Sequence, residues 1–245
     1  MTGSPALDPA VCGIDGSPAS DDAVRQAAAL CGDDGRIILV GVATPAAATH
    51  PEAALALARG TGRAISAAAR LLAPDRVEQH ELEGDPATTL IRCAERFDAG
   101  LLSVGSHGGS RIGGIVAGSV ATAVIHLAPS SVLVARPARA FPSRIVVGTD
   151  GSPSSLHAVE VAEQLPGELV VIAAAGSLLT SRSLSPRAVA ALRIDARDAV
   201  AAMLDAAEDG DLLVVGSRGL TGLKAIGSVS ERLAHRAPVS VLIVR

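Results

Sequence analysis

The chain of 245 residues contains the same series of short sequences twice. The first anchor, GIDGSP at residues 13–18, returns as GTDGSP at residues 148–153. Three more anchors follow in the same order in both places: GSHG and GSRG, GSV and GSV, and HLAP and HRAP. Because the order is kept, the sequence predicts two copies of one domain, each long enough to bury its own core. We place the copies at residues 1–137 and 143–245, joined by a linker over Arg136–Ser143.

Short apolar runs alternate with helical segments in the first copy, and several of these runs are apolar throughout, as in strands buried on both faces. This alternation predicts an α/β fold with a parallel sheet covered by helices. Ser17-Pro18 is a helix-start signal, because a side-chain cap precedes a ring already at the helical φ. The expected strands are 9–14, 36–43, 77–82 (an edge strand), 100–104 and 131–136, and the expected helices are 18–31, 52–72, 86–97 and 118–127.

The second copy is shorter than the first. The offset between the copies falls from 135 at Asp15/Asp150 to 111 at Gly105/Gly216. The missing length matches the long helix at 52–72, which we expect to be absent or reduced to a loop around 175–185. The segment Pro186–Glu208 is compatible with one continuous helix or with a short edge strand and a helix. The other expected elements are strands at 145–149, 169–174, 211–215 and 239–244 and a helix at 153–165.

Composition excludes several classes of protein. Hydrophobic residues make up 49% of the chain, but it has only two aromatic residues, Phe97 and Phe141, and a formal net charge of −4. Base stacking on aromatic platforms and a basic phosphate-binding face are therefore disfavoured, so we expect no nucleic-acid partner. The three cysteines lie singly in apolar segments and are expected to be buried, reduced thiols. The first ten residues lack a secretion signal and the uncharged run 112–135 is interrupted by glycines, so we expect no membrane span and a cytoplasmic location.

The chemistry-bearing residues follow the ends of buried strands. Asp15 and Asp150 each stand between a strand and a capped helix, and Gly105 and Gly216 follow another strand. The carboxyl ends of parallel strands form the crevice where ligands bind in such sheets. A glycine-rich segment leading into a helix at Gly118-Ser119 is suited to an anion such as phosphate, because backbone N–H groups are accessible there. Each glycine pair taken alone is equally compatible with a simple turn, and neither a P-loop nor a GxGxxG motif is present.

The complete spacing is specific. The pattern Gly105-x2-Gly108-x9-Gly118-Ser119, the strand-end Asp15 and the ending His-x-Ala-Pro-x2-Val-Leu-Val resemble the universal stress protein family, and the resemblance extends over practically the whole chain, twice. It implies a Rossmann-like fold with strand order 3-2-1-4-5, ATP bound between the ends of strands one and four, and pairing of the two domains through their fifth strands as an intramolecular pseudo-dimer. A further homodimer is compatible with it. The implied site residues of the first copy are Asp15 and Val42 for the adenine and ribose, and Gly105, His107, Gly108, Gly118, Ser119 and Val120 for the ribose and phosphates.

Both copies depart from the family pattern. Ala121 stands where many ATP-binding members have a hydroxyl, which implies the loss of one phosphate hydrogen bond, about 1–2 kcal/mol. In the second copy seven residues, not nine, separate Gly219 from Gly227. The missing helix would also uncover one side of that site. The residues that remain for a second, weaker site are Asp150, Gly216, Gly219, Gly227, Ser228 and Ser230.

No nucleophile with an adjacent base, no acid–base pair and no metal cage is evident in the sequence. The leading hypothesis is therefore a non-catalytic, ATP-binding regulator of a stress response. Two alternatives stay open: an interaction scaffold that binds no nucleotide, and a weak ATPase in which Asp15 or Asp150 coordinates Mg²⁺ with the triphosphate. The repeated His126 and His235 are interpreted as packing at helix ends, and His107 either contacts a phosphate or is solvated.

Overall fold

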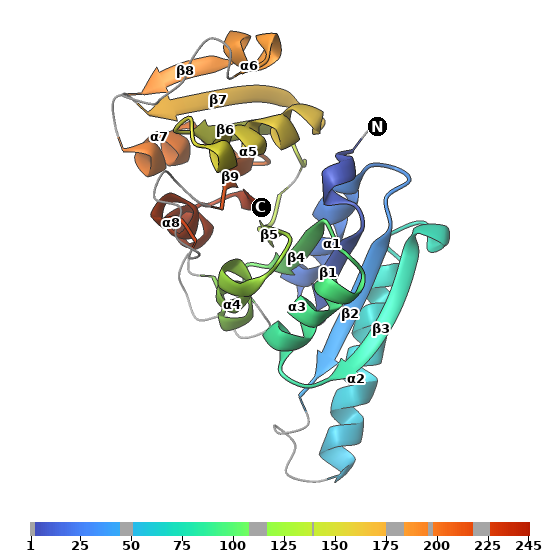
Figure 1. Cartoon of the computed structure of the whole chain (residues 1–245). Helices are drawn as coiled ribbons and strands as arrows, with labels where there is room; N and C mark the ends of the chain where they lie inside the picture. Colours follow the sequence, from blue (N-terminus) through green and yellow to red (C-terminus); the bar gives the residue numbers. More distant parts are fainter. Residues whose placement is uncertain are drawn as a thin grey trace.

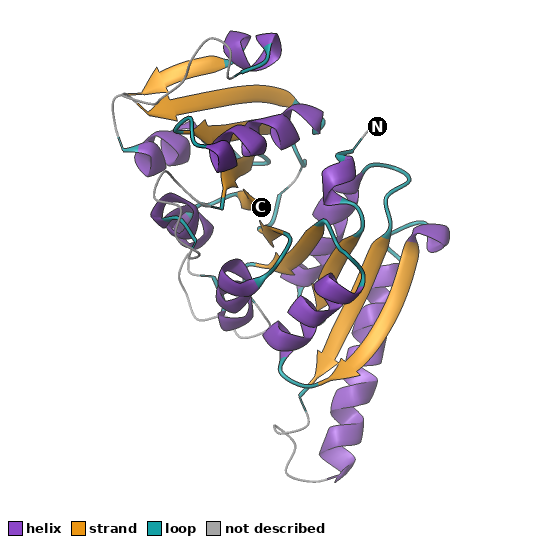
Figure 2. Cartoon of the chain, in the orientation of Figure 1, coloured by secondary structure: helices purple, strands orange, loops and turns teal. Residues whose placement is uncertain are grey.

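The computed structural model describes residues 3–44, 51–107, 117–138, 140–174, 184–195, 198–217 and 226–245, with backbone only for residues 51–57 and 174. Within these ranges helices and strands alternate along the chain (Figures 1 and 2). The strands are β1 (Ala10–Ile14), β2 (Ile37–Ala43), β3 (Val77–Glu83), β4 (Leu101–Gly105), β5 (Ser131–Ala135), β6 (Arg144–Thr149), β7 (Glu168–Ala174), β8 (Leu192–Asp195), β9 (Leu212–Gly216) and β10 (Ser240–Val244). The helices are α1 (Pro18–Cys31), α2 (Pro51–Ala69), α3 (Pro86–Arg96), α4 (Ser119–Leu127), α5 (Pro153–Gln164), α6 (Pro186–Ala190), α7 (Ala199–Ala206) and α8 (Ser228–Arg236), with short 3₁₀ turns η1 (Pro5–Leu7) and η3 (Pro74–Arg76).

The first helix of each half begins as its sequence predicts. The Ser17 hydroxyl accepts a hydrogen bond from the Ser20 amide, and Pro18 occupies the first helical position of α1. Ser152 and Pro153 do the same for α5, with Ser155 donating. A polar cap and a proline that needs no hydrogen-bond partner fix the point at which each strand gives way to a helix.

All ten strands form one sheet, in the order β3-β2-β1-β4-β5-β10-β9-β6-β7-β8. Within each half every described strand pair is parallel, and the order in both halves is 3-2-1-4-5, as the resemblance implies. The halves join where β5 and β10 pair antiparallel, with Leu133 opposite Leu242. The predicted α/β fold is confirmed.

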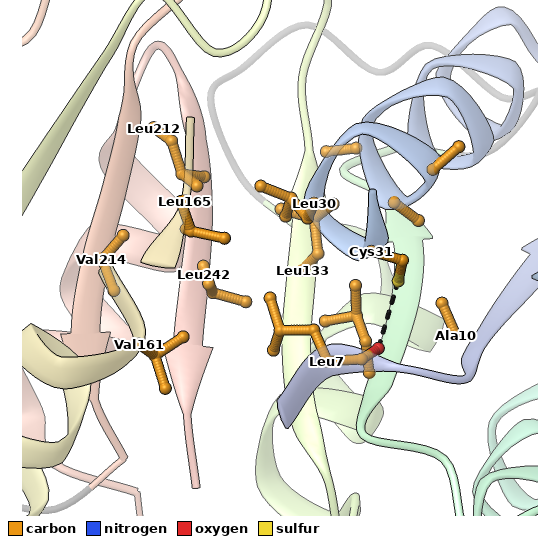
Figure 3. Close-up of a cluster of buried hydrophobic side chains, with 14 of the residues drawn as sticks. Leu7, Ala10, Leu30, Cys31, Leu133, Val161, Leu165, Leu212, Val214 and Leu242 are labelled. Carbon is orange, nitrogen blue, oxygen red and sulfur yellow. Dashed lines mark hydrogen bonds between the residues drawn. The ribbon is translucent and has the colours of Figure 1, made fainter. Parts of the chain in front are cut away.

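The core has two layers, one on each face of this sheet. One cluster joins α1, α2, α5 and α6 to the sheet, and the other joins α3, α4, α7 and α8 to its opposite face. Figure 3 shows part of the first cluster at the junction, where Leu30 and Leu133 of the first half face Leu165 and Leu242 of the second. Because the layer continues across β5 and β10, the two halves share one hydrophobic core. The chain has only two aromatic residues, so this core consists almost entirely of aliphatic side chains.

Paired hydrogen bonds at the junction follow a local twofold relation. The Arg136 amide donates to Ser240 Oγ and the Arg245 amide donates to Ser131 Oγ. The guanidinium of Arg136 donates to the carbonyl oxygen of Ala234 in α8, and that of Arg245 to the carbonyl oxygen of Ile125 in α4. Each half thus caps the last carbonyls of the other half's final helix with a cation, which is the favourable sign at a helix C-terminus.

In its described residues, the second half has only a short helix at the place of α2. Where α2 covers β2 and β3 over 19 residues, the corresponding connection in the second half contains α6, which has five. The segment Pro186–Glu208 forms α6, the edge strand β8 and α7, so the edge-strand alternative is confirmed. Most of the loop expected at 175–185 lies outside the described residues.

The three cysteines are free and buried, as expected. Burial raises the pKa of Cys31 to about 12 and also raises the pKa of Cys12 and Cys93. Among the described helices, none combines the length and apolarity needed to cross a bilayer.

Candidate functional site

A cavity of about 360 Å³ lies at the carboxyl ends of the central strands of the first half, where β1 and β4 lead into α1 and toward α4. This is the edge of a parallel sheet at which ligand sites form, and the volume lies within the usual range of such sites. All the predicted first-half residues that the structure describes line it: Asp15, Val42, Gly105, His107, Gly118, Ser119 and Val120. Gly108 lies outside the described residues.

Asp15 is held by the turn that connects β1 to α1. Its carboxylate Oδ1 accepts a hydrogen bond from the Ser17 amide at 2.9 Å, and the side chain is otherwise exposed at the rim of the cavity. An Asp bonded to the amide two residues ahead is a stable turn that leaves the second carboxylate oxygen available. The arrangement presents a hydrogen-bond acceptor, suited to a sugar hydroxyl or an amino group.

The glycine-rich segment is closed at its base by backbone hydrogen bonds. The Ser106 amide donates to the carbonyl oxygen of Ala135 at the end of β5, at 2.9 Å. The carbonyl oxygen of Ser106 accepts from the Gly118 amide at 2.8 Å. The two ends of the segment therefore stay together beside the cavity, and both are attached to the strand that reaches the second half.

The start of α4 has no side-chain cap, unlike the starts of four other described helices. Helices α1, α3, α5 and α6 begin with a Ser or Asp side chain that accepts a hydrogen bond from the first turn. Helix α4 begins with Gly118, which has no side chain to do so. The first-turn amides of a helix have no partner within the helix, so this end needs an acceptor from outside. It faces the cavity, and an anion is the acceptor best suited to it.

Gly105 lies so close to α1 that its position has no room for a side chain. The motif suggests close approach of a phosphate to the backbone, but a Cβ at Gly105 would lie 2.8 Å from the backbone carbon of Ala19 in α1. At Gly216 it would lie 2.5 Å from the carbonyl oxygen of Ser154 in α5. In both halves this glycine permits a helix to pack directly against a strand.

Several residues that line the first cavity did not follow from the motifs. Ser20 lies on the first turn of α1, and Pro86 and Leu90 come from α3 on the other face of the sheet. The repeat itself carried the signal for Ser20, because Ser155 follows Asp150 at the same interval. Pro86 and Leu90 had no such signal, since only the topology brings the start of α3 beside β1 and β2.

The second half has a corresponding but smaller cavity of about 250 Å³. It is lined by the predicted residues Asp150, Gly216, Gly227, Ser228 and Ser230, while Gly219 lies outside the described residues. Helix α8 also begins with a glycine, Gly227, and has no side-chain cap. The fully buried Met203 of α7 lines this cavity and packs against Gly148.

Asp150, in the second cavity, has more hydrogen-bond partners than Asp15 has. Asp150 Oδ1 accepts from the Ser152 amide at 3.0 Å, and the Ser155 hydroxyl lies 3.3 Å from the Asp150 amide. Partial burial acts to raise the pKa of Asp150, but hydrogen bonds from Ser152 and Ser155 outweigh it and hold the pKa below its usual value. Asp150 is therefore ionised throughout the physiological range.

Ser230 shows what a hydroxyl does at the position of Ala121. Both residues lie in the first turn of the helix that follows the glycine-rich segment, and both are buried. The Ser230 hydroxyl donates to the carbonyl oxygen of Gly216 at 2.7 Å. In the second half this hydroxyl thus donates to the protein backbone, a role that the family resemblance does not imply.

The two repeated histidines are not equivalent. His126 Nε2 lies 3.4 Å from Glu231 Oε1, so it contacts the other half, which the expected helix-end packing does not describe. His235 has a buried Nδ1 without a hydrogen-bond partner among the described residues. His107 Nδ1 lies 2.9 Å from the Ser106 hydroxyl, so its ring is oriented at the edge of the first cavity.

Comparison with known proteins agrees with this architecture. The model of the universal stress protein family matches residues 7–136 and 185–245, which together exceed half of the chain. A universal stress protein of Mycolicibacterium smegmatis is 27% identical over 282 aligned positions that cover 95% of both chains. One from Mycobacterium tuberculosis is 33% identical over 137 positions, which cover 41% of this chain and 94% of the relative.

The fold also matches a solved structure. The crystal structure of a universal stress protein from Archaeoglobus fulgidus superposes with a TM-score of 0.74, covering 98% of this chain and 96% of the other at 19% identity. At that identity the likeness concerns the fold alone, and the family match supplies the assignment. This chain belongs to the universal stress protein family.

Proposed function

We propose that the first cavity binds ATP and that the protein acts as a non-catalytic, nucleotide-dependent regulator in a stress response. The observation that carries the proposal is the uncapped start of α4, which faces a cavity bounded on its other side by the Asp15 carboxylate. A ligand with an anionic end and a hydroxyl-bearing end matches these two features.

The lining fits a nucleotide in one orientation. The phosphates would lie at Gly118, Ser119 and Val120, where first-turn amides and a serine hydroxyl are available. The ribose and adenine would lie toward Asp15 and Val42. Gly105, His107 and Gly108 would complete the phosphate side. Mg²⁺ would accompany the triphosphate, because three adjacent phosphates carry more negative charge than one helix end neutralises.

A regulatory role is supported by how the site is attached to the rest of the molecule. Ser106, at the base of the glycine-rich segment, is bonded to Ala135, and the next residue, Arg136, donates to Ala234 in α8. Helix α8 starts at the second cavity. A change in the first glycine-rich segment on binding would therefore reach the junction through adjacent residues of β5.

The second cavity is proposed to bind the same ligand more weakly. It keeps a carboxylate and an uncapped helix start, but it is smaller, at about 250 Å³ against 360 Å³. Met203 borders the smaller cavity, and Leu90 occupies the corresponding place beside the larger one. The cytoplasmic location stays a prediction of the sequence.

The test uses calorimetric titration of the full chain with ATP and Mg²⁺, after any co-purified nucleotide has been released and quantified. We expect the Gly118→Val variant to lose the tighter binding event, because its side chain enters the phosphate end of the cavity. The Gly227→Val variant is the matched control and keeps that event. Circular dichroism and thermal unfolding show whether each variant is folded.

Two outcomes would replace this proposal with another. Absence of binding at millimolar ATP in the wild-type protein favours the scaffold that binds no nucleotide. Release of phosphate that Asp15→Ala abolishes, while ATP still binds, favours the weak ATPase. Equal loss in both glycine variants would show that the two cavities do not differ as proposed.

A further inference from the structure

The two ends of the ten-stranded sheet have edge strands of different chemical character. Strand β3, at the end of the first half, carries three glutamates, Glu78, Glu81 and Glu83, and no lysine or arginine. Strand β8, at the other end, consists of Leu192, Arg193, Ile194 and Asp195. Pairing of β3 with a second β3 would place acidic side chains together, and this protects an edge against association. Strand β8 has no such excess of one charge.

Strand β8 also presents an apolar side chain to solvent. Ile194 is 74% exposed, the largest exposed fraction among the described large hydrophobic residues. By the registers of the two halves, Ile194 occupies the place that Glu81 occupies on β3. In the first half Glu81 lies beside Gly62 of α2, whereas α6 in the second half is only five residues long. Among the described residues, the shorter helix of the second half thus coincides with an apolar residue in place of a charged one at this edge position.

The hydrogen-bond pattern shows which backbone groups of β8 face outward. The Val171 amide of β7 donates to the carbonyl oxygen of Ala191 at 3.0 Å. In a parallel ladder alternate residues bond the same neighbour, so Arg193 and Asp195 also direct their N–H and C=O groups toward β7. Leu192 and Ile194 therefore direct theirs away from β7, and the described part of the sheet has no strand on that side.

We propose that β8 pairs antiparallel with β8 of a second copy of this chain, centred on Ile194. In this register Ile194 faces the partner's Ile194 as a hydrogen-bonded pair, which uses the outward backbone groups of both strands. Arg193 then lies opposite the partner's Asp195, and Asp195 opposite the partner's Arg193. The same surface serves both copies, so association closes at a dimer.

Charge selects this register over its neighbour. A shift that places Leu192 opposite the partner's Ile194 also uses outward backbone groups, but it puts Arg193 directly opposite the partner's Arg193. Like charges in facing positions destabilise a strand pair, whereas opposite charges stabilise it. Because each strand has only four residues, the interface belongs to the small, weak class, and the dimer depends on protein concentration.

The experiment is sedimentation velocity of the full chain over a rising concentration series. We expect a monomer–dimer equilibrium that Arg193→Asp weakens about tenfold or more, because two acidic pairs then face each other. Asp195→Arg weakens it similarly, and the double variant with both changes restores the dimer. Ile194→Asp removes the apolar contact and abolishes association. All four variants carry their changes on the edge strand β8, and thermal unfolding verifies that they fold.

Gln79→Arg, on the exposed surface of β3, is the matched control and leaves the dimer unchanged. Three results would overturn the proposal. These are a wild-type protein that stays monomeric up to near-millimolar concentration, a double variant no better than either single one, and oligomers larger than a dimer that respond to Gln79→Arg. The last of these would indicate pairing of β3 with β8. Amide exchange provides a separate measurement, because the Ile194 amide becomes protected only as the dimer forms.

Discussion

The two halves of this protein agree in the backbone hydrogen bonds around their cavities. They differ in the size of the cavity and in the helix and the edge strand at the outer end of the sheet. In both, the residue after the fourth strand donates to the fifth strand and accepts from the glycine before the last helix: Ser106 in the first half and Ser217 in the second. In the described part of the second half α6 stands where the first half has a long helix, the cavity is smaller, and the edge strand has an exposed isoleucine where the other edge strand has a glutamate. The two copies thus share the backbone hydrogen bonds that hold the glycine-rich segment, whereas the surrounding helices and side chains have diverged.

The largest expected effect on stability concerns the glycine at the end of the fourth strand of each half. We expect Gly216→Ala to lower the free energy of unfolding by about 3 kcal/mol, because the new Cβ would lie 2.5 Å from the Ser154 carbonyl oxygen. Gly105→Ala is expected to cost slightly less, since its nearest contact, to Ala19, is 2.8 Å. Urea denaturation measures both.

The control for this pair is Gly60→Ala in α2. A Cβ at Gly60 meets no atom within 4 Å. Because alanine is the better helix former, this variant is expected to be more stable by about 0.5–1 kcal/mol. If Gly105→Ala and Gly216→Ala were as stable as the wild type, the glycines would not be needed for helix packing. Close approach of a phosphate to the backbone would then be the better explanation for them.

The junction allows a second comparison, because its paired hydrogen bonds are only partly symmetric. Ser240 Oγ accepts from the Arg136 amide and donates to Gln26 Oε1 at 2.7 Å. The position of Gln26 in the second half is occupied by the apolar Val161. Ser131 Oγ accepts from the Arg245 amide at 3.2 Å. Ser240 therefore belongs to a buried hydrogen-bond network that includes Gln26, whereas the position equivalent to Gln26 in the second half has no polar side chain to bond Ser131.

We expect Ser240→Ala to cost about 2 kcal/mol of unfolding free energy, because it leaves buried groups of Gln26 and Arg136 without a partner. Ser131→Ala is expected to cost about 1 kcal/mol. A double-mutant cycle with Gln26→Val, which copies Val161, shows whether the network is the cause. The combined cost should fall below the sum of the single costs, and strict additivity would contradict this explanation.

A third comparison distinguishes two roles of the hydroxyl in the first turn of the last helix, which are a hydrogen bond to the backbone and a hydrogen bond to phosphate. Because the Ser230 hydroxyl donates to Gly216, Ser230→Ala is expected to cost about 1 kcal/mol of stability. Ala121→Ser adds the hydroxyl to the first half, and there we expect ATP affinity to change by no more than about twofold. A tenfold gain in affinity would instead show that the hydroxyl binds phosphate, as the sequence pattern suggests.

The repeat made most of the fold predictable, because each copy constrained the interpretation of the other. Strand β1, helix α1 and their capping turn follow directly from the GIDGSP anchor, and the strand order follows from the family resemblance. The choice of edge strand and helix within Pro186–Glu208 did not, because alanine-rich sequence favours a helix while pairing with β7 depends on tertiary context.

The candidate site was predictable only for groups that carry their own local signal. Asp15, Gly118 and Ser119 stand at element boundaries that the sequence marks, and the structure brings them to one cavity. Leu90 and Met203 come from helices on the opposite face of the sheet, and their position depends on packing between distant segments. The contact of His126 with Glu231 likewise requires the junction of β5 and β10, which no local pattern describes.

The smallest expected difference is electrostatic and concerns Asp150. Its folded-state pKa is below the usual value of 3.8, because hydrogen bonds from Ser152 and Ser155 outweigh the effect of partial burial. A lowered pKa means that the ionised side chain stabilises the fold above about pH 3.8, and that this contribution is lost as the pH falls through the folded-state pKa.

Asp150→Asn retains an acceptor oxygen for the Ser152 amide but removes the charge. We expect the variant to be slightly less stable than the wild type at neutral pH, and the difference to shrink as the pH falls below 3.8. Denaturation at a series of pH values measures the difference directly. A difference that stays constant over this range would mean that the turn after β6 depends on the shape of the side chain and gains nothing from its charge.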